Sequence, residues 1–163
     1  MGQDGNQLVW FKRDLRVDDH FPLCRAAERG PVLPLYVIEP DYWQLDDTSQ
    51  RQQDFLAECL DDLGVALKKL GLPLQIMSGS VVECLARLHD AHRLTAIHAH
   101  EETGNDWTFR RDRAVRAWCR DRGIEFIEYP QFGVERGLSD RDGWARQWEG
   151  FMGQEPAEPP TGA

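Results

Sequence analysis

The chain has 163 residues, which allows one domain with a substantial core and is short for two. Its 41% hydrophobic and 29% charged residues are ordinary for a folded soluble chain, and its six tryptophans argue against disorder. The formal net charge of -9 argues against unaided binding to nucleic acid, because phosphate recognition depends on basic surface.

The sequence also indicates the cellular compartment in which the protein is expected. The first residues, MGQDGNQ, lack the basic and apolar regions of a signal peptide, and no apolar run is long enough to span a bilayer. We therefore expect a cytoplasmic protein. Cysteine usage agrees with a reducing compartment, because free thiols inside helices behave as small hydrophobes. Four cysteines without CxxC spacing fall in four different predicted helices and provide no metal site: Cys24, Cys59, Cys84 and Cys119.

Short apolar runs alternate with segments of helical spacing along the whole chain. Each run is partly β-branched or aromatic and is bounded by Gly, Pro or charge, which is typical of a strand. Five strands are predicted, at residues 8–11, 31–38, 72–77, 94–99 and 124–129. The clearest helix runs from Ser49 to Leu70. Ser49 and Gln52 form a predicted capping box, and Gly71 followed by Pro73 ends the helix.

This alternation predicts an α/β fold. Strands that alternate strictly with helices require crossover connections, so we expect a doubly wound, Rossmann-like, five-stranded parallel sheet in three α/β/α layers. The first strand, residues 8–12, should be central. In such sheets the ligand crevice lies outside the carboxyl ends of the strands. Neither GxGxxG nor GxxxxGK[ST] follows the first strand, which argues against an ordinary dehydrogenase or P-loop enzyme.

Charged residues follow the first predicted strand directly, in the stretch VWFKRDLRVDDH at residues 9–20. Their position predicts contact with a polar ligand or with another domain. An ion-pair cluster of Arg13, Asp14 and Arg16 that pins the loop is the alternative. Trp10 and Phe11 are adjacent on a strand and point to opposite faces, so at least one of them should be core.

Four stretches, in order and spacing, resemble the amino-terminal α/β domain of the DNA photolyase and cryptochrome family. They are LVWFKRDLRVDDHFPL, VLPLYVIEPDYW, the helix with Arg51 and DFL, and HEETGNDWTFRRDRAV. The resemblance covers residues 7–150. By composition, residues 1–6 are expected to be a disordered tail and residues 151–163, rich in Pro, Gly and Glu, a linker. The resemblance implies that this linker leads to a helical domain absent from this chain.

In that family the helical domain holds the catalytic FAD, binds damaged DNA and performs the photochemistry. The resemblance therefore implies that this chain alone is not an enzyme and reaches DNA only through the helical domain of the same protein. The longer parent would be a flavoprotein, either a deoxyribodipyrimidine photolyase, which is a lyase that repairs pyrimidine dimers in light, or a blue-light receptor.

Many members of that family also hold an antenna chromophore, a reduced folate, deazaflavin or flavin, near the strand ends of the α/β domain, and others bind none. Such a site needs aromatic walls and a few orienting polar groups. Folate-binding members carry an acidic residue early in the helix after the fourth strand. That position is Thr108 here, which disfavours folate unless Glu101, Glu102 or Asp106 substitutes. By position, the candidate cofactor-binding residues are Phe11, Lys12, Arg13, Asp14, Glu39, Trp43, Glu101, Glu102, Asn105 and Asp106.

Other polar patterns are expected to be structural. His98 and His100 share a strand face, and His89 and His92 lie near a helix end, but no further metal ligands accompany them. A stripe of arginines with acidic neighbours should be a solvated helix face: Arg110, Arg113, Arg116 and Arg120, with Asp112 and Asp121. Two alternative functions stay open, a stand-alone nucleotide-binding α/β protein and a ligand-free interaction scaffold.

Overall fold

Five strands alternate with helices in the computed structural model, which describes residues 5–133 and 142–161. In chain order the elements are β1 (Asn6–Phe11), α1 (Phe21–Ala27), β2 (Val32–Ile38), the 3-10 helix η1 (Tyr42–Gln44), α2 (Gln50–Lys69), β3 (Gln75–Ser78), α3 (Val81–His92), β4 (Leu94–His100), α4 (Asp106–Arg122), β5 (Glu125–Tyr129) and α5 (Trp144–Met152).

The strands form one parallel sheet with the order β3-β2-β1-β4-β5. The predicted central position of the first strand is therefore confirmed. Trp10 pairs with Leu35 of β2, and Val9 pairs with His98 of β4. The order reverses between β1 and β4, so the carboxyl ends of these two strands lie at the switch point where doubly wound sheets bind ligands.

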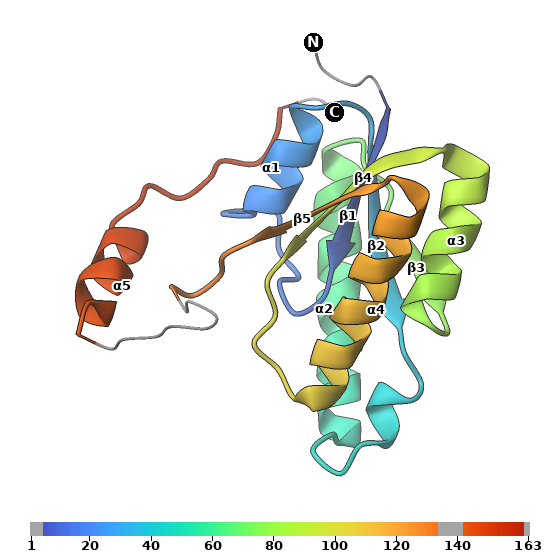
Figure 1. The fold of residues 1–163 in the computed structure, drawn as a ribbon, viewed down its shortest axis with the longest axis horizontal. Coiled ribbons are helices and arrows are strands. Elements are labelled where there is room, and N and C mark those ends of the chain that lie inside the picture. Colours follow the sequence, from blue (N-terminus) through green and yellow to red (C-terminus); the bar gives the residue numbers. More distant parts are fainter. Residues whose placement is uncertain (1–4, 134–141, 162–163) are drawn as a thin grey trace.

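Helices cover both faces of the sheet, as the predicted three layers require (Figure 1). Successive residues of β1 alternate between the faces. Leu8 and Trp10 pack in the apolar cluster under α3 and α4, and Val9 and Phe11 pack in the cluster under α1 and α2. Both aromatic residues of this strand are thus core, with exposed fractions of 1% for Trp10 and 0% for Phe11.

Helix α2 forms where the apolar spacing predicts it. The Ser49 side chain accepts a hydrogen bond from the backbone N–H of Gln52, which confirms the predicted N-terminal cap. The buried face presents Leu60, Leu63 and Leu67 to the sheet. At the other end the backbone N–H of Leu72 donates to the Leu67 carbonyl after a left-handed glycine, so the helix stops at the predicted place.

Two predicted boundaries are wrong. The third strand begins at Gln75, because Leu72 is buried in the contact that closes α2 and Pro73 has no N–H to donate to a ladder. At the other end of the chain, Asn6 belongs to β1 rather than to a disordered tail. It pairs with Leu94, and its side-chain amide donates to the His92 carbonyl. Residues 1–4 of that predicted tail lie outside the described residues.

The segment predicted as a linker starts inside a helix, because α5 extends to Met152. Helix α5 stands apart from the sheet, and the chain after it returns to α1 (Figure 1). There the N–H of Asp19 donates to the Ala157 carbonyl at 2.8 Å, and the N–H of Ala157 donates to Asp19 Oδ1 at 3.1 Å. Within the described ranges, every helix is too short or too polar to cross a bilayer.

Candidate functional site

A cavity of about 530 Å³ opens at the carboxyl ends of β1 and β2 and is bounded by η1 and the first half of α2. This volume lies within the range of small-molecule sites. Its lining combines strand-end, loop and helix residues: Trp10, Phe11, Lys12, Arg13, Leu15, Arg16, Tyr36, Val37, Glu39, Tyr42, Trp43, Gln52, Phe55, Leu56, Cys59, Glu102 and Arg111. We call it the strand-end cavity.

Aromatic rings from the sheet, η1 and α2 line the strand-end cavity. Tyr36 belongs to the sheet, Tyr42 and Trp43 to η1, and Phe55 to α2. Tyr42 holds Trp43 in an edge contact with ring centroids 5.2 Å apart. Phe55 is 66% exposed, so its ring is accessible at the mouth of the cavity. These walls suit a planar ring.

A network of buried charges closes the inner end of the cavity. Arg111 donates to Glu39 at 2.8 Å, to Asp112 at 2.9 Å and also to Glu102. Lys12 pairs with Asp112 at 3.0 Å. Burial lowers the pKa of Arg111, but the surrounding carboxylates outweigh burial and raise the pKa overall, so the guanidinium stays charged. These side chains satisfy one another and form a fixed polar wall.

The same two cations fix the orientation of Trp10. Lys12 Nζ lies 4.6 Å from the centroid of its ring, and the Arg111 guanidinium lies 4.8 Å from it. Desolvated cation–π contacts of this kind contribute about 2 kcal/mol or more. Trp10 is therefore held as a rigid part of the wall between the sheet and the charged network.

Two further cations at the cavity are less completely paired. Arg13 donates to the Tyr42 hydroxyl at 2.8 Å and lies 3.4 Å from Glu102, but 59% of its side chain is exposed. Arg16 donates to the backbone carbonyls of Asp18 and Asp19. A guanidinium has five N–H groups, so both arginines keep donors for another acceptor.

Asp14 points away from the cavity into a second buried cluster. Its carboxylate accepts from His20 Nε2 at 2.7 Å, from His100 Nδ1 at 2.6 Å and from the N–H of Lys12 at 2.8 Å. Burial opposes ionisation of Asp14, yet the hydrogen bonds from the two histidines hold its pKa well below the usual range. The aspartate thus pins the loop after β1, with histidines rather than with arginines as partners.

These three side chains also place ligand-type atoms within 4.8 Å of one another, as a metal site requires. The hydrogen bonds of His20, however, place its ring proton on the nitrogen that faces Asp14. His20 Nδ1 accepts from the backbone N–H of Leu23, so Nε2 carries the proton that is donated to Asp14. A metal-bound histidine normally donates from its other nitrogen. The cluster therefore fits a structural role better than metal binding.

The structure brings together six of the ten predicted site residues. Phe11, Lys12, Arg13, Glu39, Trp43 and Glu102 all line the strand-end cavity. Of the other four, Asp14 is in the histidine cluster, and Glu101 lies behind it, with its N–H donating to the Tyr129 carbonyl. Asn105 caps α4 through the N–H of Thr108, and Asp106 pairs with Arg110 at 2.6 Å on the surface.

Sequence reasoning missed Tyr36, Tyr42, Phe55 and Arg111 in the cavity lining. Arg111 was hidden among the neighbouring arginines of the predicted stripe, which is indeed exposed at Arg110, Arg113, Arg116 and Arg120. Asp112 corrects that prediction, because it is buried with Lys12 rather than solvated. The helical period would have shown this, since residues 108, 112 and 115 share the buried face of α4.

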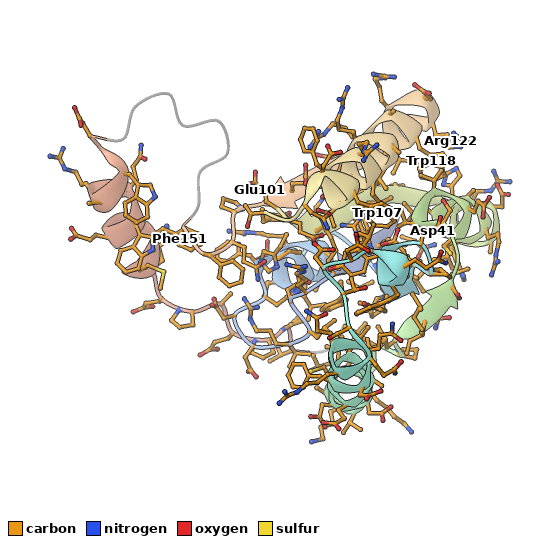
Figure 2. All side chains as sticks on the ribbon, turned by 90° about the horizontal axis from the view of Figure 1, so that it is seen from below. Asp41, Glu101, Trp107, Trp118, Arg122 and Phe151 are labelled. Carbon is orange, nitrogen blue, oxygen red and sulfur yellow. The ribbon has the colours of Figure 1, made fainter. Side chains whose placement is uncertain are left out.

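A second cavity of about 680 Å³ lies on the other side of the Glu39–Arg111 pair, between the starts of α3 and α4. Trp107, in the first turn of α4, and Asp41, in the loop after β2, lie close together there (Figure 2). The Trp107 ring also contacts Tyr42, with centroids 5.4 Å apart. The two cavities therefore share one charged wall and one aromatic stack.

Fold and site together define a doubly wound α/β domain with a small-molecule cavity at the carboxyl edge of its sheet. The chain belongs to the DNA photolyase family, whose family model matches residues 7–132. It is 32% identical over 149 residues to cryptochrome DASH, chloroplastic/mitochondrial, of Oryza sativa subsp. japonica, covering 86% of this chain and 25% of that protein. It is 36% identical over 104 residues to the deoxyribodipyrimidine photo-lyase of Salmonella typhimurium, covering 58% of this chain and 22% of that protein.

Solved structures agree on the fold. A bacterial class III photolyase from Agrobacterium tumefaciens superposes with a TM-score of 0.80 at 24% identity, covering 98% of this chain and 35% of that one. An archaeal photolyase from Sulfolobus tokodaii superposes with a TM-score of 0.73 at 25% identity, covering 96% of this chain and 37% of that one. That structure holds two FAD molecules, with the implication of a novel light-harvesting cofactor. The chain thus spans 22–37% of the length of these relatives and corresponds to their amino-terminal domain.

Proposed function

We propose that this chain is the light-harvesting domain of a photolyase or cryptochrome and that it holds an antenna chromophore in the strand-end cavity. The observation that carries the proposal is the cavity itself, which six aromatic side chains and a fixed charged wall line at the carboxyl edge of the sheet. The S. tokodaii photolyase, with its second FAD, shows that a relative of this fold accommodates such a molecule.

In this proposal the excitation absorbed by the chromophore passes to FAD in a helical domain of the same protein. Light-driven repair of pyrimidine dimers or blue-light sensing, in the cytoplasm, is then the activity of the whole protein. The family match favours this function over a stand-alone nucleotide-binding protein, and the cavity favours it over a ligand-free scaffold.

Hydrogen exchange with and without added flavin, deazaflavin or reduced folate tests the proposal. A bound chromophore should protect the backbone at residues 11–13, 39–43 and 52–59, because these segments line the cavity. The absorption spectrum of the purified chain above the tryptophan band is the first measurement to make. Protection confined to the amino-terminal edge of the sheet would place any ligand elsewhere and remove the proposal.

A further inference from the structure

A third cavity, of about 500 Å³, lies between the end of β5, the start of α1 and the carboxyl end of α5. We call it the α5 cavity. Its apolar wall consists of Phe21 of α1, Phe132 after β5, and Phe151 and Met152 of α5. Phe21, Phe132 and Met152 are exposed, so this wall is open to a ligand. None of the ten site residues predicted from the sequence is among the described residues that line it.

Helix α5 is held against the chain after β5 by a close backbone approach. Gly133 has a φ of +63°, and a Cβ there would lie 2.9 Å from the Trp148 ring and 3.2 Å from the Phe151 ring, so this approach requires glycine. On the other side, the paired hydrogen bonds between Asp19 and Ala157 hold the chain after α5 against the start of α1. The helix and the chain that follows it are both attached to the domain, and the cavity between them is therefore a defined space.

His100 gives the α5 cavity a hydrogen-bond acceptor. It ends β4, is buried and lines the cavity. Its Nδ1 donates to Asp14 at 2.6 Å, and the hydrogen bonds from two histidines keep that carboxylate ionised. A neutral imidazole that carries its proton on Nδ1 has an acceptor at Nε2. Within the described ranges this Nε2 has no partner, so it can accept from a ligand.

Gln131 gives the same cavity a hydrogen-bond donor. Its Nε2 is buried, yet it forms no hydrogen bond with any residue in the part of the chain that the structure describes. Buried polar groups in folded proteins nearly always have a partner, so this amide points to a missing ligand. His100 lies opposite Tyr129 in the register of β4 and β5, and Gln131 follows Tyr129 by two residues. The donor and the acceptor therefore come from neighbouring strand ends and line one cavity.

The charges in the lining favour an uncharged ligand. Among the described residues that line the α5 cavity, Arg16 is the only lysine or arginine, and it already donates to the backbone carbonyls of Asp18 and Asp19. The side chains of Asp19 and Glu155 also line the cavity. One guanidinium against two carboxylates does not attract an anion. In this respect the α5 cavity differs from the strand-end cavity.

We propose that the α5 cavity is a second ligand site, which binds a neutral planar ring with an N–H beside a carbonyl, that is, a cyclic amide. The ring N–H donates to His100 Nε2, and the ring carbonyl accepts from Gln131 Nε2. The faces of the ring pack against Phe132 and Phe151. The cavity volume of about 500 Å³ accommodates one bicyclic ring. This site is independent of the chromophore proposed for the strand-end cavity.

Calorimetric titration of the chain with quinazolinone and its N-methyl derivative tests the two hydrogen bonds. Quinazolinone is a neutral bicyclic ring with one N–H beside its carbonyl, and the derivative differs only in the methyl group that replaces this hydrogen. We expect quinazolinone to bind about tenfold more tightly, because methylation leaves His100 Nε2 unpaired. Bound quinazolinone should also protect residues 129–132 and 151–156 from hydrogen exchange, because these segments line the cavity.

Gln131→Leu removes the donor at nearly constant side-chain size and should weaken quinazolinone binding by about three- to tenfold. It should not lower the midpoint of urea denaturation, because the amide that it removes has no partner in the unbound chain. A purely structural Gln131 would instead lose stability without affecting the preference between the two probes. Gln147→Leu, the same change at an exposed position of α5 outside the cavity, is the control and should leave the affinity unchanged.

Several outcomes would overturn the second site. Equal affinity for the two probes, or unchanged affinity in Gln131→Leu, would remove the ligand class. Protection confined to residues 11–13, 39–43 and 52–59 would place the probe in the strand-end cavity instead. Failure of quinazolinone to bind would also overturn the site, while chromophore binding in the strand-end cavity is measured separately. The comparison of the two probes on the wild-type chain decides the question even where Gln131→Leu does not fold.

Discussion

Individual residues at the end of β1 show why the chain places four charges directly after a core strand. Lys12 turns inward to Asp112 of α4, and Asp14 turns inward to the two histidines. The side chains of Arg13 and Arg16 line the strand-end cavity instead. Charges that hold the loop in place, on Lys12 and Asp14, therefore alternate with charges that line the cavity, on Arg13 and Arg16.

Histidine burial gives the chain an acid sensitivity that can be measured. Burial lowers the pKa of His98 from 6.5 to about 4, and its ring is fixed between Gln7 and Tyr129. The unfolded chain then binds a proton near pH 6.5 that the folded chain binds only near pH 4. The free energy of unfolding should therefore be highest above pH 7 and fall as the pH drops through this window.

His98 alone should lower the free energy of unfolding by about 2 kcal/mol between pH 7 and pH 5. Buried His20, whose pKa is also lowered by burial, acts in the same direction. Urea denaturation of the wild-type chain and of His98→Gln at both pH values checks this prediction. The variant should lose less stability on acidification, and equal losses in the two proteins would contradict it.

Secondary-structure elements were predictable wherever one face is buried against the sheet. The apolar spacing of α2 and its Ser49 cap gave correct limits, because the same leucines that set the period make the core contacts. The strand at residues 75–78 was displaced in the prediction, because Leu72 satisfies the apolar pattern of a strand while it packs as a helix-closing residue. Local pattern does not distinguish these two uses of an apolar residue.

The site was predictable to the extent that strand ends determine it. Phe11, Glu39 and Glu102 could be placed from the sheet alone, because each follows or ends a parallel strand. Phe55 and Tyr42 could not, because their place depends on how η1 and α2 pack over the sheet edge. That packing is tertiary, and no spacing within the sequence encodes it.

Helix α2 contributes both core and cavity wall, so its packing can be tested directly. Leu63 is 1% exposed and packs in the cluster with Val9 and Phe11. Leu63→Ala should lower the free energy of unfolding by about 2–5 kcal/mol, because it leaves a space that the sheet cannot fill. Asp62→Ala, at the adjacent exposed position, is the control and should change it by less than about 0.5 kcal/mol. Similar shifts of the denaturation midpoint in both variants would show that α2 does not pack as described.

At the scale of the whole molecule, the charge balance separates light harvesting from DNA binding. The arginines of α4 form a basic stripe, but acidic partners accompany them, as Asp106 does for Arg110, Asp121 for Arg120 and Glu128 for Arg116. Counterion release from DNA needs cations that are not already neutralised. A surface of paired charges on a chain of net charge -9 provides few of them.

We therefore predict that this chain alone neither binds duplex DNA measurably at physiological salt nor restores thymines from dimers in light, with or without added FAD. The photochemistry belongs, in the function proposed above, to a helical FAD domain that this chain does not include. Mobility-shift assays over a range of salt, and illumination of dimer-containing oligonucleotides, check both parts, with the full-length S. typhimurium photolyase as the positive control.

A salt-dependent shift with this chain would mean that Arg13, Arg16 and the stripe on α4 form a basic surface strong enough to overcome the net charge. Such a shift should then disappear when Arg110 and Arg113 are both changed to Gln, because these two exposed side chains lie on the same face of α4. Restored thymines would instead place the repair chemistry within the α/β domain.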